Sequence, residues 1–376
     1  NGANATGIGA KAAFLARAEH DSARDVADAA RRLCHKHLRK AIHAFRRNDY
    51  GKAAVLSVDA TEADPRCGQA YHMLALSLEN LGEMAKAITM YEQALALDPG
   101  DTDLYLNLGL AAWRMGLNPV AEKFFRVYCE MEPGQPMGWN NLAGVLRDTS
   151  RFDDAIEVAR TAIMRMPEHP LLWNTLGTIL VELSDFAQAA VFYREALRLD
   201  PKFARAWHNL GYGLHHTGPL DEALDAYDHA LSLEAEPRDR IETSHARALC
   251  LIAMGRLAEG FAGYEVRHHH QHRASTLYGI DAPLWKGEAL AGRTVLVIGE
   301  QGLGDEIMFA NTLSDVAAAI GPTGRLKVAV DDRLIPLFAR SLPNAEIGNY
   351  FNASHNARDV RLVPWAGKPD FVMPLG

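Results

Sequence analysis

Asparagine recurs in this sequence at positions where it could bind an extended polypeptide. Each Asn side chain carries a hydrogen-bond donor and an acceptor, so it can bond a peptide backbone without reading its sequence. Asn107, Asn141 and Asn209 share one phase of a 34-residue period, with Thr175 between them, whereas Met73 and Arg39 occupy that phase earlier. Asn140 and Asn174 come one position before it. The pattern predicts an acceptor-binding column of Asn107, Asn140, Asn141, Asn174 and Asn209. The alternative is that Asn is a common residue of such a repeat on a solvated groove.

A second candidate site is the glycine-rich segment Gly299-Glu-Gln-Gly-Leu-Gly-Asp305. Glycines allow a tight strand-to-helix turn and a close approach of a ligand to backbone N–H groups. Gly302 and Gly304 are therefore candidate acceptor-binding residues. The spacing matches neither G-x-G-x-x-G nor a P-loop, so it specifies no nucleotide. Glu300 could orient an acceptor or pair with a backbone N–H.

A histidine-rich string, His268, His269, His270 and His272, is the third candidate. On a helix, His268 and His272 would lie one turn apart on one face, a spacing that can hold a metal ion. No acidic residue or cysteine lies within this string or directly beside it to complete a ligand set. We therefore favour a solvated helix end and predict no metal site.

The elements that must position these residues follow a fixed period. Prolines recur every 34 residues, at Pro65, Pro99, Pro133, Pro167 and Pro201. In the same phase recur an aromatic residue (Tyr71, Tyr105, Trp139, Trp173, Trp207), a small residue (Ala75, Gly109, Ala143, Gly177, Gly211) and a later alanine (Ala53, Ala87, Ala121, Ala155, Ala189, Ala223). This period is typical of the tetratricopeptide helix–turn–helix repeat. Small residues allow two helices to cross closely, and proline ends a helix.

We place six repeat units, at 34–67, 68–101, 102–135, 136–169, 170–203 and 204–237. A seventh, at about 241–272, is held in phase by Gly255, Gly260 and Tyr264. Residues 1–33, with Phe14, Leu15, Val26 and Leu33, are expected to form an amphipathic capping helix. No single unit can bury its own apolar face, so the units must stack into an α-solenoid whose first helices line the concave side.

The periodicity stops after about residue 272, and 273–292 has the composition of a linker. From 293 to 376 the sequence alternates between strand and helix patterns. We predict strands at Thr294–Ile298, Leu326–Val330, Ala345–Ile347 and Phe371–Pro374, with helices from Asp305 to about Ile320 and over Asp332–Ser341. Such alternation is typical of a doubly wound α/β unit, in which ligands bind at the carboxyl ends of the strands. Glu300–Asp305 is predicted to lie at that end.

Composition excludes some classes of function. The formal charge of −8 disfavours nonspecific nucleic-acid binding, and no apolar run approaches the roughly 18 residues that span a membrane. The four cysteines are widely spaced and predicted to be helical, buried and reduced, which favours a reducing, cytoplasmic compartment. The sequence begins at Asn1 without a recognisable signal peptide, so we expect a trimmed start.

The C-terminal motifs carry a resemblance. Gly255-Arg-Leu-Ala-Glu-Gly260, Tyr264-Glu-Val-Arg267, Pro283-Leu-Trp285-Lys-Gly287 and Glu300-Gln-Gly-Leu-Gly-Asp305 are together similar to bacterial tetratricopeptide-repeat proteins with a C-terminal GT-B glycosyltransferase-like domain. The Asn positions resemble the asparagine ladder of protein O-GlcNAc transferases. The Gly-x-Gly-Asp segment is similar to the N-terminal lobe of ADP-heptose:lipopolysaccharide heptosyltransferases.

This resemblance implies an activity and roles for two acidic residues. In the heptosyltransferases the Asp after the glycine loop is the proposed general base, and Asp305 matches it. A carboxylate there could accept the proton of an acceptor hydroxyl, or Asp305 could simply cap the following helix, and the two roles are compatible. Glu300 is the second catalytic candidate. The N-terminal lobe of a Rossmann-like GT-B fold would then end near Gly376, so we expect a truncated domain, inactive alone and without a cofactor.

Three functions remain open on the sequence. The first is a bacterial protein O-glycosyltransferase, metal-independent, whose repeats recruit an acceptor protein such as flagellin and whose complete GT-B domain transfers sugar from a nucleotide donor to Ser or Thr. The second is a non-catalytic scaffold with a degenerate α/β lobe. The third is a transferase acting on lipopolysaccharide, with the repeats used for assembly.

Overall fold

The computed structural model describes residues 26–234, 236–269, 272, 276–300, 302–355 and 358–375. It consists of two compact units, one up to Thr217 and one from Gly218 onward, and each is described by itself. Phe14 and Leu15, expected in the capping helix, lie outside the described residues. Among the residues described, no helix is long and apolar enough to cross a membrane.

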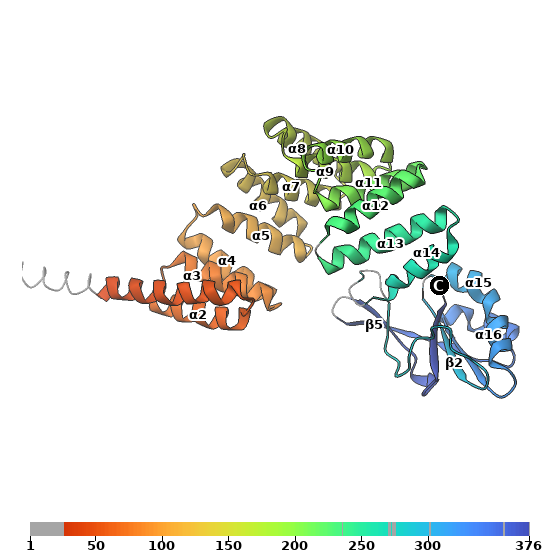
Figure 1. Ribbon diagram of the computed structural model, residues 1–376. Coiled ribbons are helices and arrows are strands. Elements are labelled where there is room, and N and C mark those ends of the chain that lie inside the picture. Colours follow the sequence, from red (N-terminus) through yellow and green to blue (C-terminus); the bar gives the residue numbers. More distant parts are fainter. Residues whose placement is uncertain are drawn as a thin grey trace, which may run out of the picture. The chain divides into compact units, whose positions relative to one another are not determined.

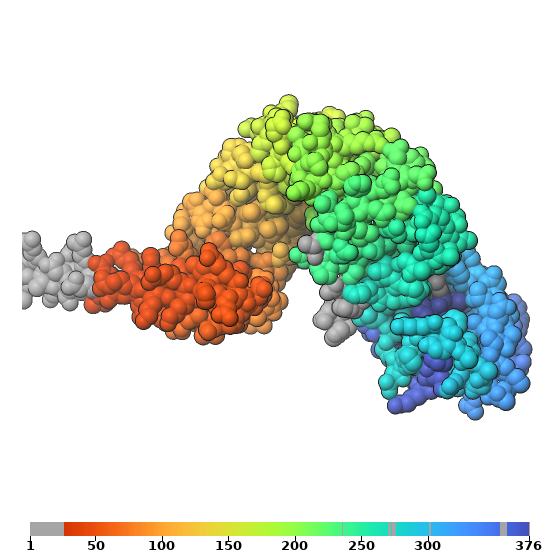
Figure 2. Space-filling view, in the orientation of Figure 1, coloured from red at the N-terminus to blue at the C-terminus, as the bar shows by residue number. Residues whose placement is uncertain are grey.

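The first unit consists of helices packed in sequence order (Figures 1 and 2). Residues 26–46 are helical, with no break at residue 33. The helices that follow are α2 (Tyr50–Ala63), α3 (Gly68–Asn80), α4 (Met84–Leu97), α5 (Thr102–Arg114), α6 (Asn118–Met131), α7 (Pro136–Asp148), α8 (Phe152–Arg165), α9 (Pro170–Glu182), α10 (Phe186–Leu199) and α11 (Ala204–Thr217). The predicted helix pairs within this unit are confirmed.

The turns explain the period. Each of the five prolines lies in the turn between one pair and the next. The turn inside each pair contains a residue with positive φ, at the same phase every 34 residues: Asn48, Gly82, Gly116, Ser150, Ser184 and Gly218. Glycine adopts this conformation without strain, whereas Ser150 (φ 59°) and Ser184 (φ 60°) adopt it at a cost.

The core of the first unit is built from small residues facing large rings. Gly109 faces Phe125, and an added Cβ would lie 2.5 Å from that ring. Gly177 faces Tyr193 at the same 2.5 Å. Both rings are at most 1% exposed. A glycine in α5 or α9 is therefore required by the ring on the next helix, since close packing leaves no room for a methyl group.

The second unit begins with α12 (Leu220–Leu233), α13 (Pro237–Ala253), α14 (Leu257–Tyr264) and the 3₁₀ turn η1 (Glu265–His268). Helices α13 and α14 pack as a pair, as predicted for a seventh repeat. Gly255 forms their turn with φ 78°, and Gly260 lies against Ile252, where an added Cβ would be 2.6 Å from the Ile side chain.

An α/β part follows. Strands β2 (Thr294–Gly299), β3 (Arg325–Val330), β4 (Glu346–Asn349) and β7 (Phe371–Leu375) form a parallel sheet in the order β4-β3-β2-β7. These four strands are the ones that the sequence predicted. The first predicted helix is divided into α15 (Leu303–Phe309), η2 (Ala310–Thr312) and α16 (Leu313–Ile320). The second is η3 (Asp332–Leu334) followed by α17 (Ile335–Ser341).

The two faces of this sheet are covered differently. On one face Val295, Val297 and Val328 pack with Leu313 and Phe338 of α16 and α17. On the other face, the side chains around Leu296, Ile298 and Ala329 pack with the segment that contains Tyr278 and Leu284 and with Trp365. A doubly wound sheet has helices on both faces. In the described residues helices cover one, so the sheets are compatible with the predicted α/β lobe and differ from it on the second face.

Three strands were not predicted. Strand β1 (Leu277–Tyr278) lies in the stretch expected to be a linker, and it pairs in parallel with β6 (Arg358–Leu362). Strand β6 pairs antiparallel with β5 (Phe351–His355), and η4 (Pro364–Ala366) follows. Leu284 forms a further bridge to Val372 of β7. Residues 277–279 and 283–285 are thus joined to the α/β part by backbone pairing.

Candidate functional site

The predicted asparagine column forms hydrogen bonds between neighbouring repeats. The Nδ2 of Asn209 donates to the Oδ1 of Asn174 at 2.9 Å, and the hydroxyl of Thr175 donates to the Oδ1 of Asn140 at 2.8 Å. The Nδ2 of Asn107 lies 2.9 Å from the Nε2 of His72. Each bond joins the sixth position of one unit to the fifth position of the unit before. The residues of the column lie on the first helix of each repeat, and their side chains connect neighbouring repeats.

Asn141 departs from this pattern for a reason visible in the sequence. The residue at the fifth position of the preceding unit is Leu106, which offers no acceptor. The Oδ1 of Asn141 accepts a bond from Asn140 at 3.0 Å, and its Nδ2 is buried without a partner among the described residues. Asn174 and Asn141 are each 5% exposed, whereas Asn107, Asn140 and Asn209 are half-buried. Binding of an acceptor by the column stays a prediction, with the half-buried amides as its accessible members.

The recurrent aromatic residue has a local function. The indole N–H groups of Trp139, Trp173 and Trp207 donate to the carbonyls of Pro133, Pro167 and Pro201 at 3.1, 2.7 and 2.9 Å. Tyr105 donates its hydroxyl to Pro99 O at 3.1 Å. In these four repeats the ring therefore ties the first turn of the helix to the proline turn before it.

In the second unit, Glu300 forms a polar cluster at the carboxyl end of β2. Its Oε1 lies 3.6 Å from the Nε of Arg267 and 3.9 Å from the Nδ1 of His268. The guanidinium of Arg267 stacks on Tyr264, 4.6 Å from the ring centre, which explains the three-residue spacing in the Tyr264-Glu-Val-Arg267 motif. The end of the last helical pair is thereby joined to the sheet.

Several atoms of this cluster have no hydrogen-bond partner among the residues that the structure describes. They are the Oε2 of Glu300, the Nε of Arg267 and the hydroxyl of Tyr278, and all three are buried within the described structure. Burial, followed by the nearby Glu300 carboxylate, raises the pKa of Tyr278 far above its ordinary value, so the phenol is a neutral donor. Buried polar atoms nearly always have a partner, so the Oε2 acceptor of Glu300 and the hydroxyl donor of Tyr278 are suited to a hydroxyl-bearing ligand or an ordered water.

A second buried carboxylate, Glu306, was missed by sequence reasoning. It is fully buried, and it accepts bonds from Asp331 N (2.9 Å) and the Tyr350 hydroxyl (2.8 Å), with Arg361 3.9 Å away. Arg361 stacks on the Tyr350 ring at 4.1 Å. Burial and the bond to Glu306 raise the pKa of Tyr350 to about 12.

Glu306 needs the glycine loop for a structural reason. An added Cβ on Gly299 would lie 2.2 Å from the Glu306 carboxylate. Gly299 therefore makes room for a buried side chain on α15, in addition to ending β2. The one signal in the sequence was an acidic residue directly after Asp305 in a segment otherwise read as a loop and a helix start.

The other predicted residues of the loop have simpler surroundings. Asp305 is half-buried, and its Oδ2 accepts the backbone N–H of Gly302 at 3.2 Å, so it caps the start of α15. Gly302 and Gly304 are exposed. The capping role of Asp305 is thus present in the structure, and its role as a base stays a prediction.

The histidine string neither places His268 and His272 on one helical face nor forms a solvated helix end. The 3₁₀ turn ends at His268 and His269 is extended, so His268 and His272 are not on one helical face. They are not solvated either, because the side chains are 15% and 4% exposed. His272 lies beside His245, with ring centres 4.6 Å apart. The expected solvated helix end is wrong, and His270 lies outside the described residues, among which no metal-binding group of three His, Cys, Asp or Glu occurs.

The cysteines are free, and three are buried. Burial raises the pKa of Cys34 and of Cys129 to about 12, so both are unreactive thiols near neutral pH. Cys67 was predicted to be helical and buried. It instead precedes α3 in the turn and is half-buried.

These helix pairs define a class of protein. The tetratricopeptide-repeat family model matches residues 38–102, 72–136, 106–170 and 174–239, and the chain belongs to this family. Its repeats are modules of protein–protein interaction.

Among known proteins, the chain is 38% identical to protein FlbA of Caulobacter vibrioides over 350 residues, which is 90% of this chain and 59% of FlbA. It thus spans a little over half the length of this relative. Yeast Tom70 has the same repeat fold, with a TM-score of 0.50 and 22% identity over 68% of this chain and 54% of Tom70. A thermophilic tetratricopeptide-repeat protein of Thermus thermophilus gives a TM-score of 0.42 and 22% identity, over 48% of this chain and 98% of its own.

Proposed function

We propose that this chain is the recruiting part and the acceptor-side lobe of a bacterial protein O-glycosyltransferase. The repeats hold an acceptor protein, for which flagellin is a candidate, and a GT-B domain transfers a sugar from a nucleotide donor to Ser or Thr. The coarser statement, a repeat protein that binds other proteins, follows from the family. The transferase activity is the proposal.

One observation carries the proposal. The strands that flank β2 are β3 and β7, so the chain leaves β2 toward one side first and returns on the other. In open parallel sheets, ligands bind at the carboxyl ends of the strands where the order reverses in this way. Glu300 lies at that end, and its Oε2 and the Tyr278 hydroxyl have no hydrogen-bond partner among the described residues, while the guanidinium of Arg267 lies beside the carboxylate. A sugar or side-chain hydroxyl could donate to the carboxylate and accept from the phenol or guanidinium.

The proposed chemistry assigns a role to each acidic residue. Asp305 accepts the proton of the acceptor hydroxyl while that oxygen attacks the anomeric carbon and the nucleotide leaves. Glu300 orients the acceptor, and Gly302 and Gly304 leave the backbone approachable. Glu306 positions this region from beneath, because it ties α15 to Asp331 and Tyr350.

The test uses the full-length protein with its acceptor and donor, and measures transfer by the intact mass of the acceptor. Asp305→Asn should reduce the rate by at least about a hundredfold while leaving acceptor binding intact. Asp315→Asn is the matched control, because Asp315 is exposed on α16. Unchanged turnover in Asp305→Asn would remove Asp305 from the role of base.

A non-catalytic scaffold is the second candidate. It is favoured by the observation that Asp305 already serves as a helix cap. Calorimetric titration of the full-length protein with nucleotide sugars separates the two, because a scaffold should bind none of them. Recovery of lipopolysaccharide, and of no protein, as the modified product would favour the glycan transferase.

A further inference from the structure

The first helical pair contains an open cavity of about 960 Å³ with an unusual lining. Basic side chains dominate it, and Asp49 is the one acidic residue among them. The basic residues are Lys36, Arg39, Lys40, His43, Arg47 and Lys52, and we call them the basic pocket. All six are exposed. The chain as a whole has a formal charge of −8, so this concentration of positive charge runs against its overall composition.

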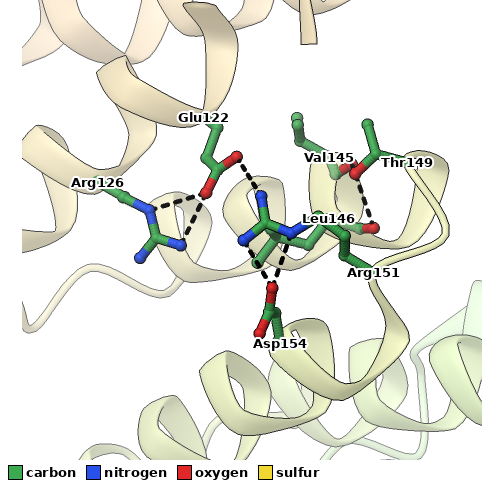
Figure 3. Close-up of polar contacts among 7 residues, drawn as sticks. All are labelled: Glu122, Arg126, Val145, Leu146, Thr149, Arg151 and Asp154. Atoms are coloured by element: carbon green, nitrogen blue, oxygen red, sulfur yellow. Dashed lines mark hydrogen bonds and ion pairs between the residues drawn. The ribbon is translucent and has the colours of Figure 1, made fainter. Parts of the chain in front are cut away.

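Ion pairs distinguish the cations of this pocket from other arginines of the unit. Within the described part of the chain, none of the Lys and Arg side chains of the basic pocket forms an ion pair, and Asp49 instead accepts the backbone N–H of Lys52 at 3.2 Å. Elsewhere in the first unit, several arginines form ion pairs, among them Arg114, Arg126 and Arg151. Figure 3 shows Glu122 between Arg126 (2.8 Å) and Arg151 (2.7 Å), with Arg151 also bound to Asp154 (2.6 Å).

This concentration of positive charge is unfavourable for the helix at 26–46 in the absence of a partner. On the helix at 26–46, Lys36 lies three residues before Arg39 and four residues before Lys40. Like charges at this spacing destabilise a helix by a few tenths of a kcal/mol per pair. An anionic partner in the cavity would remove this repulsion and form charge-assisted hydrogen bonds with the same side chains.

The pocket continues the face that carries the asparagine column. Arg39 occupies the sixth position of its unit, the phase of Asn107 and Asn209. Leu38 and Met73, at the fifth and sixth positions of successive units, belong to one apolar cluster. Asn174 and Asn209 occupy the same two positions in later units, where their side chains form a hydrogen bond. The same register therefore extends from the column to the first unit.

We propose that the basic pocket binds an acidic segment of a polypeptide, at one end of the groove whose amides hold its extended backbone. A polypeptide fits better than a nucleic acid, because the net negative charge of the chain opposes a long polyanion and because the family binds proteins. This site goes beyond the proposed transferase activity and does not depend on it. A scaffold would use it equally.

The test measures fluorescence anisotropy with the whole chain and a labelled dodecapeptide of alternating Glu and Ser. Its twin with Gln in place of Glu and a dodecathymidine single strand are the comparison probes. Lys36→Gln/Lys40→Gln should weaken binding of the acidic peptide by about tenfold at ~0.15 M salt. The control is Lys123→Gln/Arg160→Gln, which removes two exposed cations outside the pocket and should change binding less than about twofold.

Each other outcome overturns the proposal. Equal affinity for the Glu and Gln peptides would show that the pocket does not read negative charge. Equal loss in the control variant would show a diffuse effect of net charge. The chain could instead bind dodecathymidine more tightly than the acidic peptide and lose this binding in Lys36→Gln/Lys40→Gln. That result would make the pocket a nucleic-acid site.

Discussion

The amide nitrogen of Asn209 donates a hydrogen bond to the side-chain oxygen of Asn174, 2.9 Å away on the first helix of the preceding repeat. Asn174 is 5% exposed, so this bond lies largely away from water. It gives the asparagine column a structural function that is independent of any ligand. The same bond leaves Asn209 with a further N–H and a carbonyl oxygen for a bound chain.

Asn209→Ala should destabilise the repeats by about 1–2 kcal/mol, because the buried Oδ1 of Asn174 loses its donor. Urea unfolding of Asn209→Ala, Asn174→Ala and the double variant measures this effect and the coupling between the two side chains. If the destabilisation of the double variant equals the sum of the two single variants, the prediction is contradicted, because the bond would then contribute nothing to stability.

Gly177→Ala should destabilise by about 1–3 kcal/mol, because the new methyl group would lie 2.5 Å from the fully packed ring of Tyr193. Gly213→Ala is the matched control in α11. Its nearest neighbour would be at an ordinary 3.5 Å, so helix propensity should stabilise it by up to about 1 kcal/mol. Opposite signs in thermal unfolding are expected, and equal effects would refute the close crossing of α9 and α10.

Ser150→Gly should stabilise the first unit by about 0.5–1 kcal/mol, because Ser150 has a φ of 59° that glycine adopts freely. The neighbour Thr149 is the control. Its hydroxyl bonds the carbonyls of Val145 and Leu146 at the end of α7, as Figure 3 shows, and Thr149→Gly should lower the unfolding temperature. A destabilised Ser150→Gly would contradict the strain at this turn.

Tyr350→Phe should cost the second unit about 1–2 kcal/mol, because the buried Glu306 carboxylate loses the phenol bond of 2.8 Å. Glu306→Gln should cost at least as much, since the amide replaces an acceptor oxygen by a donor. Asp315→Asn, on an exposed side chain of α16, serves as control. Hydrogen exchange at the amides of β2 and β3 measures these changes, and a neutral Tyr350→Phe would argue against the bond.

Stability should fall as the pH falls through the histidine range. Burial, followed by the charge of His272, lowers the pKa of His245, and burial followed by Arg267 lowers that of His268. Unfolded histidine has a pKa of about 6.5, so the unfolded state binds these protons more readily. Their contribution is complete above about pH 6.5 and is lost below it.

His245→Phe tests this dependence, because a phenyl ring preserves the stacking on Tyr264, now 5.2 Å between ring centres, and does not titrate. Unfolding temperatures at pH values of about 7.5 and 5.5 should differ less in this variant than in the native chain. An unchanged difference would exclude His245 as a source of the effect.

The sequence alone determined the repeats, and it did so because their contacts are local. A 34-residue period in proline, aromatic and small residues predicts where each helix pair begins, since each helix packs on its neighbours in the chain. Strands β2, β3 and β7 were also predictable, because strands buried on both faces are continuous apolar runs. Strands β5 and β6 were not, because Asn352, Ser354 and Arg361 interrupt any apolar pattern.

The polar clusters of the second unit were decided by tertiary structure. Glu300 meets Arg267, and Glu306 meets Tyr350 and Asp331, only after the sheet has brought the ends of separate strands together. The column was visible in the sequence as repeated Asn, but its inter-repeat bonds depend on how neighbouring helices align. Periodic local packing is written in the spacing of residues. A buried charge is stabilised by partners far away in the chain, and no short-range pattern specifies them.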